Sequence, residues 1–205
     1  MTVRNRVTVP VVIKSGVLPY ISPFQLNSRI GVHLSWTPTL GRWWTDLATG
    51  WQVSMPFRLY SEVLDGEQNT HRYQGGVPVA VDAVAELSDV RVAVSIDLPL
   101  PAVRIIDVSG ALNVLQPAIR TDGRQTRSRL PATVGTVERI RMASIAVGIP
   151  AVAGMGWVAN QYLPGTVREY ELRCSPSGLY TYPSTEGEGD DGHYREELLV
   201  VDLAC

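Results

Sequence analysis

Three neighbouring runs of sequence decide the fold: Arg29-Ile-Gly-Val-His-Leu-Ser-Trp36, Arg42-Trp-Trp-Thr-Asp-Leu47 and Trp51-Gln-Val-Ser-Met-Pro-Phe-Arg-Leu-Tyr60. In the first run, apolar residues alternate with glycine or polar residues, which is the period of a strand with one buried face. Pro38 with Gly41, and then Gly50, supply turn chemistry between the runs. Residues 29–62 are therefore predicted to form a meander of three consecutive antiparallel strands.

The predicted meander carries four of the five tryptophans of the chain. Trp43 and Trp44 are adjacent, so their side chains point to opposite faces of a strand and one of them faces away from the sheet's own core. One interpretation is core packing, in which each indole N–H needs a partner. The other is that Trp43, Trp44 or Trp51 is an anchor at a protein interface or a platform for stacking a sugar.

The remaining chain reads as short strands separated by glycine and proline. The clearest is residues 90–98, where valine, isoleucine and leucine alternate with other residues. Pro56 cannot donate to a ladder and predicts an edge or a bulge in its strand. Further strands are expected at residues 7–13, 77–87 with a helical turn at its end, 103–108, 111–115 and 162–173, whereas residues 134–147 fit a helix or a strand.

The expected fold is mainly β: an antiparallel β-sandwich or jelly-roll-like domain with long loops and little helix. We expect one domain over residues 1–205, with an N-terminal extended segment over 1–28 and a C-terminal closing hairpin over 166–205. Residues 65–76 are polar, end in Gly75-Gly76 and are expected to form an exposed loop.

Composition narrows the classes of partner. The formal net charge of −2 on 205 residues does not select nucleic acid or a membrane surface. Lys14 is the only lysine, and arginine suits bidentate contacts at interfaces, although a high-GC genome gives the same bias. No run is long enough for a transmembrane helix, and the N-terminus lacks the apolar run of a signal peptide.

An arginine-containing run is the first candidate site. Arg120, Arg124, Arg127 and Arg129 lie in a polar, glycine-containing segment. They could contact a partner protein, bind phosphate or form a plain exposed loop. Without interleaved aromatic residues they are a weak signal for nucleic acid.

An acidic run is the second candidate site. Glu186, Glu188, Asp190 and Glu197 have the spacing of calcium ligands, but Asp191 stands where the calcium loop requires glycine. A solvated loop tip is the favoured interpretation. No cofactor is expected.

Catalytic motifs are sparse. Two cysteines, Cys174 and Cys205, make no disulfide framework, although Cys205 could form an intermolecular disulfide or stay a free thiol. Three isolated histidines form no metal motif, and there is no phosphate-binding loop or nucleophile elbow. Paired carboxylates stay open, because their separation is a three-dimensional quantity. We expect a protein that is not an enzyme.

The run Leu34-Ser-Trp-Thr-Pro-Thr-Leu-Gly-Arg-Trp-Trp-Thr-Asp-Leu47, followed by Thr49-Gly50, resembles small β-proteins of tailed-phage tails and baseplates. The valine-rich, proline-punctuated strands also resemble icosahedral jelly-roll coat proteins, although no basic N-terminal arm is present. Both resemblances imply a structural subunit of the virion, made in the host cytoplasm, whose partners are copies of itself and other virion proteins. The alternative is a carbohydrate-binding β-sandwich that uses exposed tryptophans.

Overall fold

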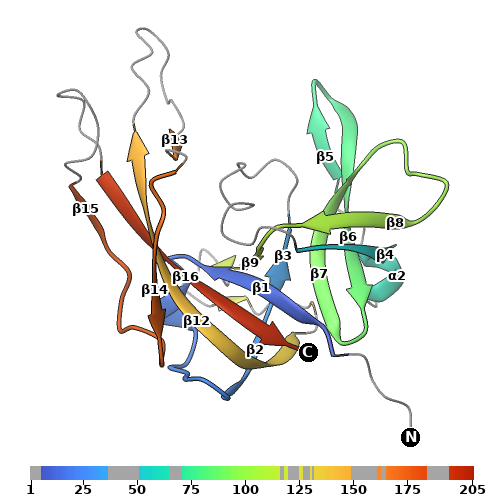
Figure 1. Cartoon of the computed structure of the whole chain (residues 1–205). Helices are drawn as coiled ribbons and strands as arrows, with labels where there is room; N and C mark the ends of the chain where they lie inside the picture. Colours follow the sequence, from blue (N-terminus) through green and yellow to red (C-terminus); the bar gives the residue numbers. More distant parts are fainter. Residues whose placement is uncertain are drawn as a thin grey trace, which may run out of the picture.

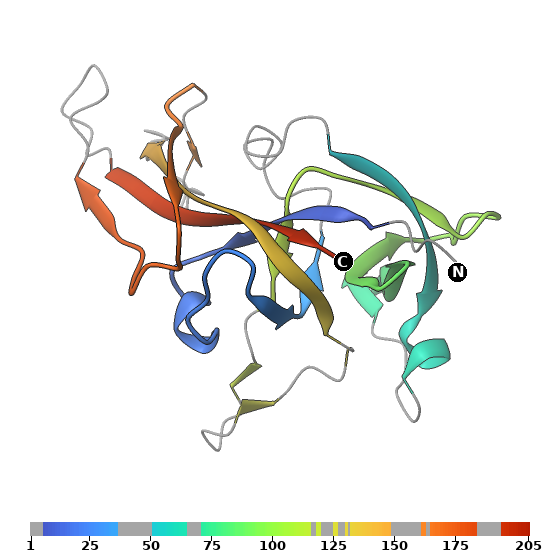
Figure 2. The same ribbon diagram turned by 60° about the horizontal axis from the view of Figure 1, so that its bottom comes forward.

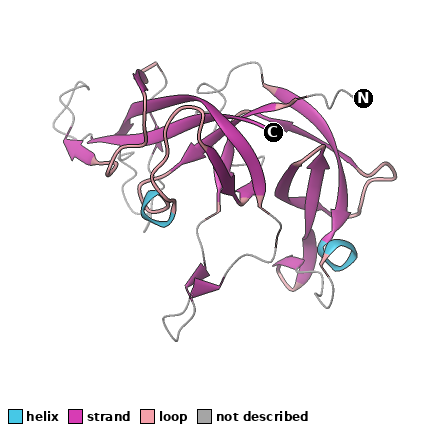
Figure 3. Ribbon diagram, turned by 90° about the horizontal axis from the view of Figure 1, so that it is seen from below, coloured by secondary structure: helices cyan, strands magenta, loops and turns pink. Residues whose placement is uncertain are grey.

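The computed structural model describes residues 6–36, 51–64, 71–115, 118–119, 125–126, 130, 132–148, 161–162, 165–183 and 194–205. These residues are mainly β, which confirms the expected fold class (Figure 1). The strands are β1 (Thr8–Ile13), β2 (Arg29–Val32), β3 (Leu34–Ser35), β4 (Gln52–Leu59), β5 (His71–Gln74), β6 (Val77–Leu87), β7 (Val90–Asp97), β8 (Ile105–Ser109), β9 (Leu112–Val114), β10 (Ala118–Ile119), β11 (Gln125–Thr126), β12 (Thr133–Gly148), β13 (Gln161–Tyr162), β14 (Arg168–Leu172), β15 (Thr181–Pro183) and β16 (Tyr194–Ala204). Two short helices are described, η1 (Leu18–Tyr20) and α2 (Tyr60–Val63), and they lie in separate parts of the molecule (Figure 3).

Most strands belong to one 14-stranded sheet with the path β13-β12-β16-β1-β9-β3-β7-β6-β4-β8. Four strands lie off this path: β14 and β2 pair with β12, β15 with β16, and β5 with β6. The sheet is mixed, since the ladders of β1 with β9 and of β3 with β7 are parallel. The expectation of purely antiparallel pairing is corrected at these two places.

The longest ladder joins β12 to β16 and settles the ambiguous segment 134–147 as strand. β16 also pairs with β1, so it lies between two strands. Its run Leu198–Val201 is fully buried, as is typical of a strand covered on both faces. β15 and β16 form the expected C-terminal hairpin (Figure 2).

The alternating strand 90–98 is confirmed as β7. Val90, Val92, Val94 and Ile96 are buried, and the residues between them are partly exposed. β6 stays extended to Leu87, because its backbone pairs with β7 to that residue. The helical turn expected at the end of 77–87 is therefore wrong.

The predicted meander is also wrong for the strands that the structure describes. His33 interrupts the first run, so that β2 pairs with β12 while β3 pairs with β7 and β9. β4 pairs with β6 and β8, so the described partners of this strand, like those of β2 and β3, come from other parts of the chain. Local alternation located extended chain in both runs but did not predict the break at His33, and the partners of these strands are distant in sequence. The middle run, residues 42–47, lies outside the described residues.

Pro56 marks the point at which β4 changes partner. The β8 ladder ends at Pro56, and the β6 ladder begins at Phe57. The missing N–H of Pro56 therefore leaves no gap in the β6 ladder. The predicted edge or bulge is corrected, because β4 lies between β6 and β8 in the order of the sheet and its ladder with β8 runs to Pro56 without a register shift.

Apolar residues pack on both faces of the sheet. The main core contains Val11, Leu34, Met55, Phe57 and Leu199, all nearly inaccessible to water. A second, smaller cluster lies on the opposite face, where it holds Val12, Ala111, Ala143, Ile145, Leu198 and Val200. No helix among the described residues is long and apolar enough to cross a membrane.

Candidate interaction surface

A hairpin arm projects from the sheet where β5 and β6 extend beyond the neighbouring strands (Figure 1). We define the arm as residues 72–79, which are all exposed, whereas Ala80 and Val81 next to it are buried. Tyr73 and Val77 are exposed to 64% and 62%. The arm therefore presents an aromatic and an aliphatic side chain that the chain's own core does not cover.

The arm's turn follows from its two glycines. Gly75 and Gly76 have φ values of 59° and 81°, and Gln74 pairs with Val77 across them. Positive φ at both central residues of a two-residue loop is the type I′ geometry that suits the twist of a hairpin. The expected exposed loop over 65–76 is corrected here, since His71–Gln74 is strand β5 and only the Gly-Gly turn is loop. Residues 65–70 lie outside the described residues.

Polar groups from four elements meet at the base of the arm. Arg72 of β5 donates from Nε to Ser95 Oγ of β7 at 3.1 Å. Burial raises the pKa of Asp82 above its ordinary value, and the hydrogen bond from Ser95 opposes this effect in part. Burial, and then the charge of Asp82, raises the pKa of Tyr60 in α2. These groups, with His71 near Asp82, tie the base of the arm to the sheet.

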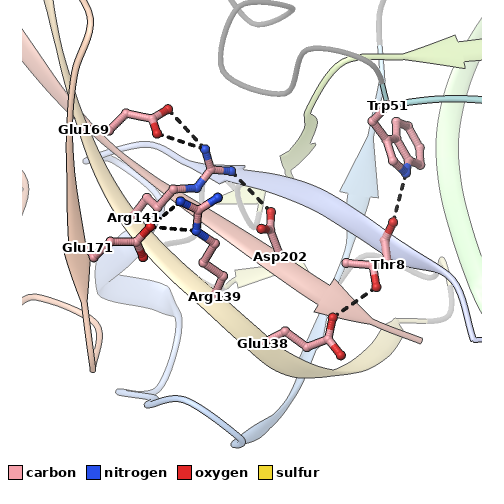
Figure 4. A network of polar contacts seen from close by, with 8 residues as sticks. All are labelled: Thr8, Trp51, Glu138, Arg139, Arg141, Glu169, Glu171 and Asp202. Carbon is pink, nitrogen blue, oxygen red and sulfur yellow. Dashed lines mark hydrogen bonds and ion pairs between the residues drawn. The ribbon is translucent and has the colours of Figure 1, made fainter.

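A ladder of alternating charge lies on β14, β12 and β16 (Figure 4). Arg141 donates from Nη1 to both carboxylate oxygens of Glu169 at 3.1 Å, and its Nη2 lies 3.4 Å from Asp202 Oδ1. Arg139 donates to Glu171 from Nε at 2.7 Å and from Nη2. Hydrogen bonds from Arg139 lower the pKa of Glu171. Because these charges pair across β14, β12 and β16, we assign the ladder to holding β14 on β12.

Two indoles join distant parts of the sheet. Trp51 donates from Nε1 to the carbonyl of Thr8 at 2.9 Å (Figure 4), and Trp36 donates to the carbonyl of Ser109 at the same distance. Both rings are partly buried and pack on the main core. The core-packing interpretation therefore accounts for Trp51, and its role at an interface stays a prediction.

The other predicted site residues lie outside the described residues: Trp43, Trp44, Arg120, Arg124, Arg127, Arg129, Glu186, Glu188 and Asp190. Of the proposed calcium ligands only Glu197 is described. Its carboxylate accepts the backbone N–H of Tyr180 at 2.9 Å within the C-terminal hairpin. No group of three or more potential His, Cys, Asp or Glu ligands occurs among the described residues.

Sequence reasoning missed the arm because His-Arg-Tyr-Gln, residues 71–74, has no apolar periodicity. A strand that projects from a core has no buried face to impose that period. The signal that could have located it is the pair Gly75-Gly76, directly followed by the strand that begins at Val77.

Comparison with known proteins adds no relative: no family model, no curated protein and no solved structure matches this chain.

Proposed function

We propose that this chain is a non-enzymatic structural subunit of a virus particle, a component of a capsid or of a phage tail or baseplate, that assembles through protein–protein contacts. The observation that carries the proposal is the hairpin arm with its exposed Tyr73 and Val77. The virion setting is supported by the resemblance of residues 34–50, of which only residues 34–36 are described.

Leaving the arm uncovered carries a free-energy cost. A two-stranded hairpin that stands alone is marginally stable in water, because it has no second layer on which to bury its side chains. Covering Tyr73 and Val77 with a partner removes apolar surface from water, worth about 25 cal/mol per Å². Tyrosine is enriched at the centres of protein interfaces. The arm thus gains order and burial when a partner covers it.

A site-specific crosslink tests the contact. The photoreactive residue p-benzoylphenylalanine replaces Tyr73 in one variant and Tyr180 in the control, because Tyr180 is equally exposed, at 63%, but lies next to β15, away from the arm. We expect crosslinks from position 73 to a second copy or to another particle protein, and few from position 180. Equal crosslinking at both positions, or none at position 73, overturns the role of the arm.

The presence of this chain in virus particles is tested separately. Particles from the source of the gene are purified on a density gradient and their proteins are identified by mass spectrometry. The proposal expects this chain at a stoichiometric level in the particle fraction. Its absence from intact particles overturns the virion assignment, whatever the crosslinking shows.

Variants of the arm test whether its contact with a partner is needed for assembly. Tyr73→Ser with Val77→Ser removes the apolar side chains without touching the core, so the thermal midpoint should stay within about 2 °C. Self-association measured by light scattering, or incorporation into particles, should fall at least tenfold. Unchanged assembly of a folded double variant contradicts the proposal.

The carbohydrate-binding alternative depends on tryptophans with an open face. Trp51 is partly buried and its N–H is bonded to Thr8, so no described tryptophan of the predicted platform favours sugar stacking.

A further inference from the structure

A pocket of about 400 Å³ lies between η1 and the start of β2. It is lined by residues 20–24 and 28–31, which include Tyr20, Ser22, Phe24, Ser28, Arg29 and Ile30. This connection lies beside the end of β14, on the part of the molecule that does not carry the arm (Figure 2). The volume is at the lower end of the range for small-molecule sites, so it suits a ligand of monosaccharide size.

Two polar side chains of the pocket are uncommitted. Neither Arg29 nor Ser22 makes a side-chain hydrogen bond or ion pair with a residue that the structure describes. Arg139 and Arg141 of the charge ladder, by contrast, are each bonded to a carboxylate. A guanidinium without a partner, placed at a pocket, offers its donors to a carboxylate, which it binds in bidentate geometry.

Residues 25–27, which join the two lining segments of the pocket, are fixed by the surrounding backbone. Asn27 donates from its N–H to the carbonyl of Val137 at 2.8 Å, and Leu26 donates to the carbonyl of Arg173 at 3.0 Å. Ser28 Oγ accepts the N–H of Gln25 at 3.1 Å. Asn27 holds a φ of 66°, which closes the turn between Gln25 and Ser28. A site on a backbone tied to β12 and to the end of β14 loses little order when a ligand binds.

We infer that this pocket binds a sugar acid of the hexuronate class, with the carboxylate on Arg29 and the hydroxyls of the sugar on Ser22 and the polar backbone of the connection. The lining decides against a purely apolar acid, because the polar part of its surface is larger than the apolar part, although Ile21, Pro23, Phe24 and Ile30 also line the pocket. Tyr20, exposed to 40%, provides an aromatic edge for the sugar ring. This inference is independent of the proposed assembly function.

Saturation-transfer NMR on the full chain tests the inference with three probes: D-glucuronate, D-glucose as the neutral match, and benzoate as an apolar carboxylate. We expect binding of glucuronate at least tenfold tighter than that of glucose or benzoate. Arg29→Gln should weaken glucuronate binding about tenfold or more, since hydrogen bonds to charged groups are the stronger ones. Ser22→Ala should weaken it by a smaller factor.

Arg58→Gln is the matched control, because Arg58 is an exposed arginine that pairs with Glu86 on the arm-bearing part of the sheet. Its glucuronate affinity should stay at the native value. Equal affinity for glucose and glucuronate would show that the carboxylate contributes nothing to binding. Equal affinity for benzoate and glucuronate would show that the hydroxyls of the sugar contribute nothing. Absence of glucuronate binding, or an Arg29→Gln variant that is folded and binds normally, overturns the inference.

Discussion

The indole N–H of Trp51 donates to the carbonyl oxygen of Thr8 at 2.9 Å and joins the beginning of β4 to the beginning of β1. In the order of the sheet, β9, β3, β7 and β6 lie between these two strands. The bond therefore requires the sheet to roll until its β4 end meets β1. Trp36, bonded to Ser109, makes a second tie between β3 and β8.

Trp51→Phe tests the first tie. The change keeps most of the ring but removes the donor, so the folded state should lose about 1 kcal/mol, the usual net worth of one hydrogen bond. The measurement is urea unfolding followed by circular dichroism. Tyr180→Phe is the control, since that ring is 63% exposed and no effect beyond about 0.5 kcal/mol is expected there. A Trp51→Phe variant as stable as the native chain would show that the indole bond contributes nothing.

Thr133→Val tests the contact between β12 and β7. Thr133 is fully buried, and its hydroxyl accepts the N–H of Arg91 at 2.8 Å and donates to the carbonyl of Arg91 at 3.0 Å. Valine has the same shape but leaves both backbone groups without these bonds. We expect a loss of about 2 kcal/mol in the free energy of unfolding. The same change at exposed Thr181 should cost far less, and equal losses at both positions would contradict the argument.

Strand positions were largely readable from the sequence, whereas strand partners were not. Period-two alternation located β7 because that strand has one buried and one partly exposed face. The same alternation in residues 29–36 could not show that the chain changes neighbours at His33, because β12 and β7 are far away in sequence. Turn residues between two strands indicate a reversal of the chain but do not require the strands to pair.

The candidate sites, like the strand partners, could be predicted from the sequence only in part. The arm lacks apolar periodicity and was read as loop. The pocket is lined by residues 20–24 and 28–31, and those up to residue 28 were read only as part of an N-terminal extended segment. Trp51 was recognised as a large aromatic that needs a partner for its N–H, and Thr8 provides that partner. Which carbonyl it reaches depends on how the sheet rolls, a property of the whole fold.

Two glycines on paired strands give a matched test of packing. A Cβ at Gly135 would lie 2.9 Å from Cys205 Sγ and 3.1 Å from the carbonyl of Ala204, whereas one at Gly31 would lie 3.6 Å from its nearest neighbour. Gly135→Ala should therefore cost about 1–3 kcal/mol by overpacking. Gly31→Ala should be neutral or slightly stabilising, because alanine reduces the entropy of the unfolded chain. Thermal unfolding of both variants measures the difference, and equal midpoints would refute the crowding at Gly135.

The two thiols should differ in reactivity with pH. Cys174 is exposed, whereas Cys205 packs on the main core, and its burial, with the charge of Asp89 second, raises its pKa to about 11. Because the thiolate is the nucleophile, iodoacetamide at pH 8 should label Cys174 and leave Cys205 nearly unmodified. A folded pKa above the ordinary value of 9.0 means that the Cys205 proton stabilises the fold fully below pH 9, and this contribution is lost as the pH rises through about 11. Peptide mapping by mass spectrometry measures both sites, and Cys205→Ser should remove this part of the alkaline destabilisation. Comparable labelling of both cysteines in the folded chain at pH 8 would contradict the burial argument and would reopen Cys205 for an intermolecular disulfide.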